Sequence, residues 1–294
     1  MSTRNFREMF TNRQVKANTM LCVGLDPLKK NIPSFVREKC TTDEMAFFRW
    51  MRDVVDATAP YACMFKPQRA HWEAIENGER ALRMIVGHIH KNHPGIPVFG
   101  DCKRGDIART QTQYRVAHFE LDGFDGMNYN GYMGKDTLGA LVDKSHLVRA
   151  LVGLGRTSNP EAWEFQDRLG TDGKKNWEFM IEQILKWSEE FGVLENAGVV
   201  MGAAHPKSGD TNVIYSEHLS HAREIVGDKL WFLIPGVGKQ GGAVKETVEA
   251  SYCGPGSIAV NSSSDVIFAS DGPDFAEAAA KKAMTTQDTL NQYR

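Results

Sequence analysis

The sequence predicts a single α/β domain, residues 1–294, with the fold of a (β/α)₈ TIM barrel. Eight short apolar segments alternate with helical patterns, and no change of composition marks a linker between domains. Such segments are typical of a parallel sheet buried on both faces, and eight in about 250 residues favour a closed barrel over an open doubly wound sheet. Polar and glycine-rich residues follow the strands, where a barrel of this kind places its active site.

The first half of the chain begins with an amphipathic helix over residues 4–17, in which Phe6, Met9 and Phe10 lie among charges. Two apolar strands follow, each stopped by a proline. A capping box at residues 41–44 begins the helix between them, and apolar residues at 81–89 mark the next helix. A third strand runs into the segment 100–110. The strands are expected at residues 20–27, 62–66 and 96–99.

The second half repeats the alternation of strand and helix. Its helices are expected at residues 110–121, 175–192 and 274–292, and the second of these is amphipathic. Its strands are short apolar runs bounded by glycine, proline or asparagine, which are typical turn residues. These strands are expected at residues 126–130, 147–154, 198–203, 230–234 and 257–261.

Bulk composition narrows the class of protein. The chain is 41% hydrophobic and 24% charged, as is usual for a soluble globular protein, and its net charge of −2 gives no reason to expect nucleic acid or an anionic membrane as partner. No apolar run approaches the roughly 18 residues of a membrane span, and the polar N-terminus is not a signal peptide. Five cysteines without a CxxC pair predict a cytoplasmic protein with free thiols.

Charged side chains end the first three strands, namely Asp26, Lys66 and the pair Asp101 and Lys103. These strands are neighbours in a barrel, so the side chains should converge at one rim. Asp101 and Lys103 are two apart on a strand and should project together, whereas Asp106 lies past the strand end. A buried alternation of acid and ammonium is seldom kept for stability alone. We interpret the group as a candidate catalytic site, with a surface salt-bridge cluster as the alternative.

Two further segments could bind ligands. The glycine-rich loop Pro235–Gly242 follows the seventh strand, where barrels often bind phosphate, although a simple tight turn is the alternative. His88, His90 and His93 resemble a metal triplet, but residues two apart lie on different faces of a helix. We interpret the three histidines as a solvated helix terminus and predict no metal site.

The charged segment also carries a family resemblance. It resembles the motif of the orotidine 5′-phosphate decarboxylases, most closely the longer bacterial subgroup. The likeness continues in order through most of the chain. It implies a (β/α)₈-barrel homodimer that converts orotidine 5′-phosphate to UMP and CO₂ in de novo pyrimidine biosynthesis, without metal or cofactor. The matching segments are Asp101-x-Lys103-x-x-Asp106-Ile107-x-x-Thr110, Val23–Pro27, Phe65–Gln68, Asn130 with Tyr132–Gly134, Thr157–Pro160 and Pro235–Gly242.

The resemblance also implies roles for single residues. Lys103 would protonate C6 of the pyrimidine, Asp101 would lie near the departing carboxylate, and Lys66 would bind ribose together with Asp26. A second group would enter the active site of the partner subunit, and a third would contact the substrate, with Ser158 at the pyrimidine edge and Gln240 at the phosphate. The second group is Asp106, Ile107 and Thr110, and the third is Asn130, Ser158, Pro235, Gln240, Gly241 and Ser264.

The sequence departs from the family at the phosphate end. Ser264 stands where the family has an arginine that clamps the phosphate, and Asp265 beside it would repel a dianion. Gly131 replaces a proline of the family in the loop after the fourth strand. We therefore expect weakened phosphate affinity unless another cation, such as Arg156 or Lys239, replaces the arginine.

Two other functions are compatible with these residues. One is a Mg²⁺-dependent lyase acting on sugar phosphates, because related barrels carry a similar Asp-x-Lys-x-x-Asp motif. The other is a nucleotide-binding or regulatory homologue that has lost catalysis together with its phosphate arginine. Sensitivity to EDTA would favour the first, and nucleotide binding without turnover would favour the second.

Overall fold

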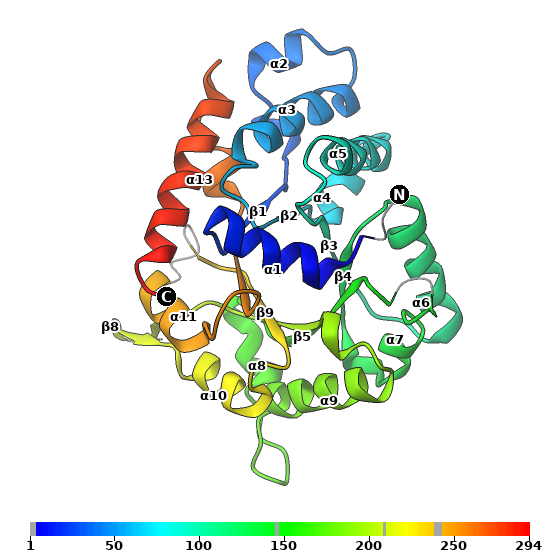
Figure 1. The fold of residues 1–294 in the computed structure, drawn as a ribbon, viewed down its shortest axis with the longest axis vertical. Coiled ribbons are helices and arrows are strands. Elements are labelled where there is room, and N and C mark those ends of the chain that lie inside the picture. Colours follow the sequence, from blue (N-terminus) through cyan, green and yellow to red (C-terminus); the bar gives the residue numbers. More distant parts are fainter. Residues whose placement is uncertain (1–3, 145–146, 208–209, 238–242) are drawn as a thin grey trace.

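The computed structural model describes residues 4–144, 147–207, 210–237 and 243–294. Eight parallel strands lie in the order β2-β1-β10-β9-β6-β5-β4-β3, and isolated bridges at Phe65–Val98 and Gln68–Asp101 join β2 to β3. The predicted (β/α)₈ barrel is thereby confirmed (Figure 1). Its strands are β1 (Leu21–Gly24), β2 (Met64–Lys66), β3 (Phe99–Arg104), β4 (Gly126–Tyr129), β5 (Ala150–Arg156), β6 (Ala197–Met201), β9 (Trp231–Ile234) and β10 (Ile258–Ser262).

Helices surround the barrel, as Figure 1 shows. None of the helices in the described part of the chain is long and apolar enough to cross a membrane. The α-helices are α1 (Phe6–Ala17), α2 (Ser34–Glu38), α3 (Asp43–Thr58), α4 (Arg69–Glu73), α5 (Gly78–Asn92), α6 (Ala108–Arg115), α7 (Asp136–Gly139), α8 (Trp163–Gln166), α9 (Asn176–Glu190), α10 (Glu217–Val226), α11 (Val244–Ser251), α12 (Ser264–Ile267) and α13 (Phe275–Asn291). Shorter helical turns are η1 (Lys29–Asn31), η3 (Gly131–Met133), η5 (Pro160–Ala162) and η6 (Leu194–Asn196), and a π-helical segment, η2 (Val116–Leu121), continues α6.

Helix α1 closes one end of the barrel, across which it lies in Figure 1. The rings of Phe6 and Phe10 lie 5.3 and 5.1 Å from that of Trp231, at the start of β9. The ring of Phe6 also contacts Phe99, the first residue of β3, at 6.3 Å. Just before α1, the Arg4 guanidinium donates two hydrogen bonds of 2.8 Å to the buried Asp125 carboxylate. Aromatic packing thus seals the amino-terminal ends of the strands and leaves the other end for a site.

Several segments differ from the sequence prediction, among them helices α10 and α11, which were not predicted. Strand β3 begins at Phe99, where the predicted strand ends, and carries the charged residues within it. The predicted helix at 110–121 begins earlier, at Ala108, and becomes π-helical from Val116. An antiparallel pair, β7 (His205–Lys207) and β8 (Asp210–Tyr215), was not predicted, because these residues form no apolar run.

Candidate active site

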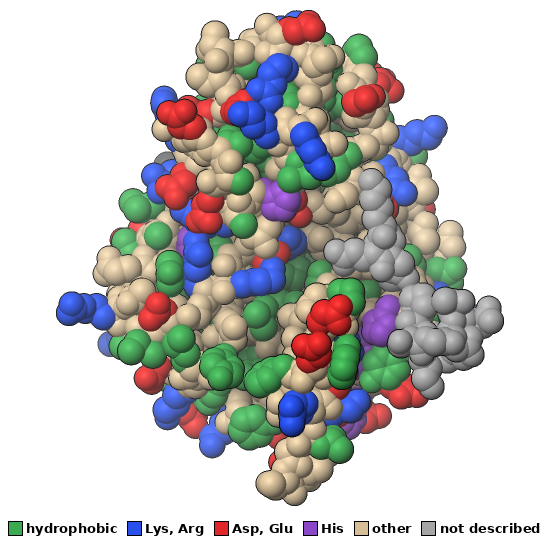
Figure 2. Space-filling model, turned by 180° about the vertical axis from the view of Figure 1, so that it is seen from behind, with side chains coloured by type: hydrophobic (Ala, Val, Ile, Leu, Met, Phe, Trp, Pro, Cys, Tyr) green, Lys and Arg blue, Asp and Glu red, His purple; other side chains and the backbone are tan. Residues whose placement is uncertain are grey.

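The charged residues lie at the barrel end opposite α1, where the parallel strands end. Figure 2 views this face of the molecule, with lysine, arginine and acidic side chains around a hollowed centre. Lys66 is the last residue of β2, and Asp101 and Lys103 lie on the outgoing half of the neighbouring strand β3. The chain topology therefore brings the three side chains together, as the sequence predicts.

Asp101 joins the two lysines. Its Oδ2 atom lies 2.9 Å from Lys66 Nζ, and its Oδ1 atom lies 2.5 Å from Lys103 Nζ. The Lys66 side chain is 4% exposed and that of Lys103 is 44% exposed. The ammonium of Lys66 is thus buried in the barrel wall, whereas that of Lys103 faces the open end of the barrel. A surface salt-bridge cluster, the alternative interpretation, does not fit an acid and a lysine buried this deeply.

The charges hold one another in their ionised forms. Burial alone would lower the pKa of Lys66, but the negative charges of Asp101 and Asp26 outweigh burial and raise that pKa well above its ordinary value. Burial alone would raise the pKa of Asp101, but Lys66 and Lys103 outweigh it and hold that pKa well below its ordinary value. The site therefore keeps a carboxylate between two ammonium groups at neutral pH.

Asn128 on β4 positions this group, although it is not among the site residues predicted from the sequence. Its Nδ2 atom donates to Asp101 Oδ1 at 2.7 Å, and its Oδ1 atom accepts from the backbone N–H groups of Cys102 and Lys103 at 2.8 and 2.6 Å. Lys103 has a φ of 46°, in the left-handed region that a lysine rarely adopts. The Asn128 carbonyl holds this backbone turn, which aims the ammonium of Lys103 at Asp101. The only sequence signal was an amide inside an otherwise apolar strand.

Asp26 lies beside the charged group and also lines a cavity. Its Oδ1 atom accepts from the backbone N–H of Gln68 at 2.9 Å, whereas the ammonium of Lys66 bonds to Asp101. The cavity, of about 230 Å³, lies at the ends of β1, β9 and β10 and includes Pro235 and Ser264 in its wall. Asp26, Pro235 and Ser264 therefore line one cavity. Gln240 and Gly241 lie outside the described residues.

Two other predicted substrate contacts, Asn130 and Ser158, lie at or next to a second cavity. Asn130 and Thr157 line this cavity of about 360 Å³ between the ends of β4 and β5. Asn130 accepts a hydrogen bond of 3.0 Å from the backbone N–H of Tyr132. Ser158, next to Thr157, is exposed, and its backbone lies against Gly202 after β6. A Cβ at Gly202 would come 3.2 Å from the Ser158 Cα, so a glycine there lets the two segments approach closely.

Asp106, Ile107 and Thr110 do not join the charged group of their own chain. Asp106 is half-buried, and its Oδ1 atom accepts the backbone N–H of Ile107 at 2.8 Å. The side chain of Ile107 is 57% exposed, and Thr110 is exposed as well. Asp106 and Ile107 lie just before α6 and Thr110 lies in its first turn, so that Ile107 and Thr110 face solvent beside the barrel opening.

Of the two cations considered as replacements for the phosphate arginine, Arg156 is already engaged. Its guanidinium forms a fork with the Asp167 carboxylate at 3.1 and 3.0 Å, and its side chain is 9% exposed. Lys239 lies outside the described residues. Asp265, which the sequence suggests would repel a phosphate, lies 3.9 Å from the ammonium of Lys282 on α13. That lysine offsets part of the negative charge of Asp265.

Comparison with known proteins decides the family. A model described as the orotidine 5′-phosphate decarboxylase / HUMPS family matches residues 19–281. The chain belongs to this family. It is 36% identical over 290 residues to an orotidine 5′-phosphate decarboxylase of Ralstonia pickettii, covering 98% of this chain and 99% of that protein. It is 35% identical over 278 residues to the enzyme of Aromatoleum aromaticum, covering 94% of this chain and 95% of that one.

A solved structure of the family shares the architecture. The Leishmania donovani OMP decarboxylase is 26% identical and superposes with a TM-score of 0.76, covering 98% of this chain and all of that chain. The resemblance and the barrel predicted from the sequence are both confirmed by these matches. Because the matches cover nearly the full length, decarboxylase-family membership applies to the chain as a whole.

Proposed function

We propose that this protein decarboxylates orotidine 5′-phosphate to UMP in de novo pyrimidine biosynthesis, with Lys103 as proton donor. The observation that carries the proposal is the 2.5 Å contact between Lys103 Nζ and an Asp101 carboxylate that Lys66 also binds, at the open end of the barrel. Family membership supports the substrate. The five free cysteines fit a cytoplasmic enzyme.

The chemistry of the reaction suits this arrangement. The bond between C6 and the carboxylate breaks, CO₂ leaves, and the electron pair stays on a vinylic carbon that has no adjacent π-system to receive it. A fixed ammonium beside that carbon stabilises the developing charge and then supplies the proton. Asp101, held ionised between its lysines, lies next to Lys103 and keeps its ammonium oriented. In this proposal Lys66 and Asp26 bind the ribose.

No step of this scheme requires a metal ion, which separates it from the Mg²⁺-dependent lyase considered above. The proposal therefore predicts that EDTA leaves the conversion of orotidine 5′-phosphate to UMP unchanged. A metal-stabilised enediolate mechanism would lose activity under the same treatment.

We further propose that the active protein is a homodimer in which Asp106, Ile107 and Thr110 complete the partner's site. The exposure of Ile107 and Thr110 beside the barrel opening supports this arrangement, as does the contact of Asp106 with the backbone of Ile107 rather than with Lys66, Asp101 or Lys103. Mixing Lys103→Ala with Asp106→Asn should then restore activity, because a mixed dimer has one site free of both substitutions. With random exchange of subunits in a twofold dimer, about a quarter of the sites recover.

The matched control is a mixture of Lys103→Ala with Asp101→Asn, whose substitutions fall in the same chain's charged group. In that mixture every site of a mixed dimer carries a defect, and no activity should return. If the Lys103→Ala and Asp106→Asn mixture also stayed inactive while subunits exchanged, Asp106 would act in its own chain.

The phosphate end of the site provides a separate prediction. Ser264 lines the 230 Å³ cavity together with Pro235 and Gly236, so an arginine there can reach a phosphate bound in that cavity. We expect Ser264→Arg to lower the KM for orotidine 5′-phosphate about tenfold or more, because a charge-assisted hydrogen bond contributes roughly 1.5–3 kcal/mol. Steady-state kinetics measure the change.

The matched control for Ser264→Arg is Ser220→Arg, which adds the same charge to the exposed face of α10. Its KM should match that of the parent protein. Equal values of KM in both variants would show that Ser264 does not face the phosphate.

A further inference from the structure

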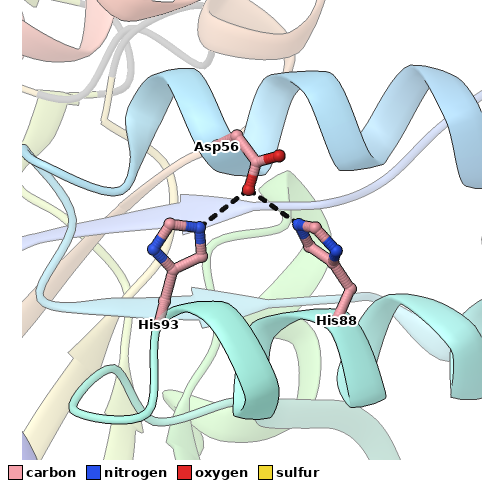
Figure 3. Close-up of side chains that lie close together, drawn as sticks. All are labelled: Asp56, His88 and His93. Atoms are coloured by element: carbon pink, nitrogen blue, oxygen red, sulfur yellow. Dashed lines mark hydrogen bonds and ion pairs between the residues drawn. The ribbon is translucent and has the colours of Figure 1, made fainter.

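Three side chains meet on the outside of the barrel, near the amino-terminal ends of its strands. Asp56 comes from α3, His88 from α5, and His93 follows the last residue of α5. The Nε2 atoms of His88 and His93 lie 2.7 and 2.8 Å from the same oxygen of Asp56, Oδ1 (Figure 3). The sequence interpretation of a solvated helix terminus is therefore incomplete. His90 alone points elsewhere, to Asp125 at 3.3 Å.

The three side chains offer a set of donors that suits a borderline transition metal. Two imidazole nitrogens and one carboxylate oxygen lie within 4.8 Å of one another. Zn²⁺ binds such donors at about 2.0–2.2 Å in tetrahedral sites, so the donor atoms around it stand roughly 3.3 Å apart. Small rotations of exposed or half-buried side chains reach that spacing from the present contacts. The backbone does not have to move.

We propose that Asp56, His88 and His93 form a binding site for a divalent transition-metal ion of the zinc class. Three protein ligands leave one coordination position for water or another small ligand. Asp56 and His93 also line a groove of about 560 Å³ between α1, the end of α3 and the segment before β3, so the open position can face this groove. The ion would link α3 to α5.

The position of the site separates it from the decarboxylation reaction. The groove includes Ala59 and Ile96, which precede β2 and β3, whereas Lys66 and Lys103 stand at the outgoing ends of these strands. The amino-terminal face of a barrel contributes to stability rather than to catalysis. Metal binding is therefore expected to change the thermal stability of the protein and leave UMP formation unchanged.

Asn92 sets one condition for metal binding. Its Nδ2 atom lies 3.0 Å from His88 Nδ1 and 2.9 Å from the His88 carbonyl oxygen. In this orientation the amide donates to Nδ1, so the ring proton of neutral His88 lies on Nε2 and is donated to Asp56. A metal on Nε2 shifts that proton to Nδ1, and Asn92 must turn its oxygen toward the ring. An aspartate at this position would accept the proton directly, as carboxylates do behind many metal-bound histidines.

Calorimetric titration of the full chain with Zn²⁺ tests the proposal. We expect one ion per chain at this site, with affinity reduced at least about tenfold by Asp56→Asn, His88→Ala or His93→Ala, and raised by Asn92→Asp. The matched control is His221→Ala, because His221 also contacts carboxylates, those of Glu178 and Glu224, at the surface. That variant should bind Zn²⁺ as the parent does.

Thermal unfolding provides the second readout. Zn²⁺ should raise the melting temperature of the parent protein and have no such effect on Asp56→Asn. The proposal is overturned if Zn²⁺ does not bind, or if binding survives all three ligand substitutions. It is also overturned if Asn92→Asp fails to tighten binding, because His88 Nε2 would then not be a ligand. If the three side chains only form hydrogen bonds and bind no metal, Asp56→Asn should lower the melting temperature by the same amount with and without Zn²⁺.

Discussion

The Lys103→Ala variant is expected to form UMP at least about four orders of magnitude more slowly than the parent protein, because one side chain supplies both the proton and the nearest positive charge. The fold should remain, since Lys103 is half exposed and Asp101 keeps its contacts with Lys66 and Asn128. Single-turnover kinetics with orotidine 5′-phosphate measure the loss. Circular dichroism checks the fold.

Lys174→Ala is the matched control for this variant. The Lys174 side chain is 45% exposed and pairs with one acid, Glu182, at 2.6 Å, much as Lys103 pairs with Asp101. Removal of Lys174 should leave turnover within experimental error of the parent. Full activity in Lys103→Ala would mean that the proton at C6 comes from another group, and the proposed mechanism would be wrong.

Asp101→Asn is expected to reduce both activity and stability. The substitution removes the charge that orients Lys103, and loss of such a preorganised group typically slows turnover about 10²–10³-fold. It also leaves the buried ammonium of Lys66 without its nearest counter-ion, which typically lowers the free energy of unfolding by about 3–5 kcal/mol. Urea unfolding at neutral pH measures the second effect.

The pH dependence of that stability loss has a definite sign. In the parent protein the pKa of Lys66 is raised, so its pairing stabilises the fold below the ordinary lysine pKa and is lost only as pH rises through the higher folded value. In Asp101→Asn the burial of Lys66 lowers that pKa, and the folded variant prefers neutral Lys66. The difference in free energy of unfolding between the parent protein and Asp101→Asn should therefore become smaller as pH rises from about 7 to about 10.

Asp43→Asn is the matched control for Asp101→Asn. Asp43 also pairs with two cations, but the side chains of these partners, Lys29 and Arg37, are 65% and 40% exposed. Ion pairs with such exposed partners contribute no more than about 1 kcal/mol. This variant should keep its activity and most of its stability at every pH. If Asp101→Asn behaved like Asp43→Asn, the charged group at the barrel opening would be an ordinary solvated cluster.

The barrel could be predicted from sequence because its strands are short apolar runs with helices between them. The position of β3 was predicted less well. The apolar run that predicted this strand ends at Phe99, where the strand in fact begins, because its outgoing half consists of Asp101, Lys103 and other polar residues. Partners on neighbouring strands, Lys66 and Asn128, make burial of these charges possible, and a single segment does not reveal them.

The candidate site was predictable in part for the same reason. Charged residues at strand ends predicted the contacts of Lys66, Asp101 and Lys103. Asn128 carries no charge and gave only a weak signal, although it holds Lys103 in its left-handed conformation. The approach of Asp56 to His88 joins residues 32 positions apart on two helices, and no periodicity within either helix predicts such a contact.

His93 shows a second limit of reasoning from helix periodicity. Helical spacing predicted that His88 and His90, two residues apart, would lie on different faces of the helix, and the three histidines were therefore interpreted as a solvated helix terminus. His93, however, lies just beyond α5 with φ −131° and ψ 55°, so the helix no longer fixes the direction of its side chain. This change of backbone conformation lets His93 turn back toward the Asp56 oxygen that His88 also contacts.

The central claim is that this chain decarboxylates orotidine 5′-phosphate at the group formed by Lys66, Asp101 and Lys103. The most direct test is an ultraviolet assay of the purified protein with orotidine 5′-phosphate, and in parallel with orotidine, with UMP identified as product. We predict turnover of the phosphorylated substrate, with a preference over orotidine that is smaller than in a relative carrying the phosphate arginine. Tight nucleotide binding with no UMP formed would contradict the claim and indicate a binding protein.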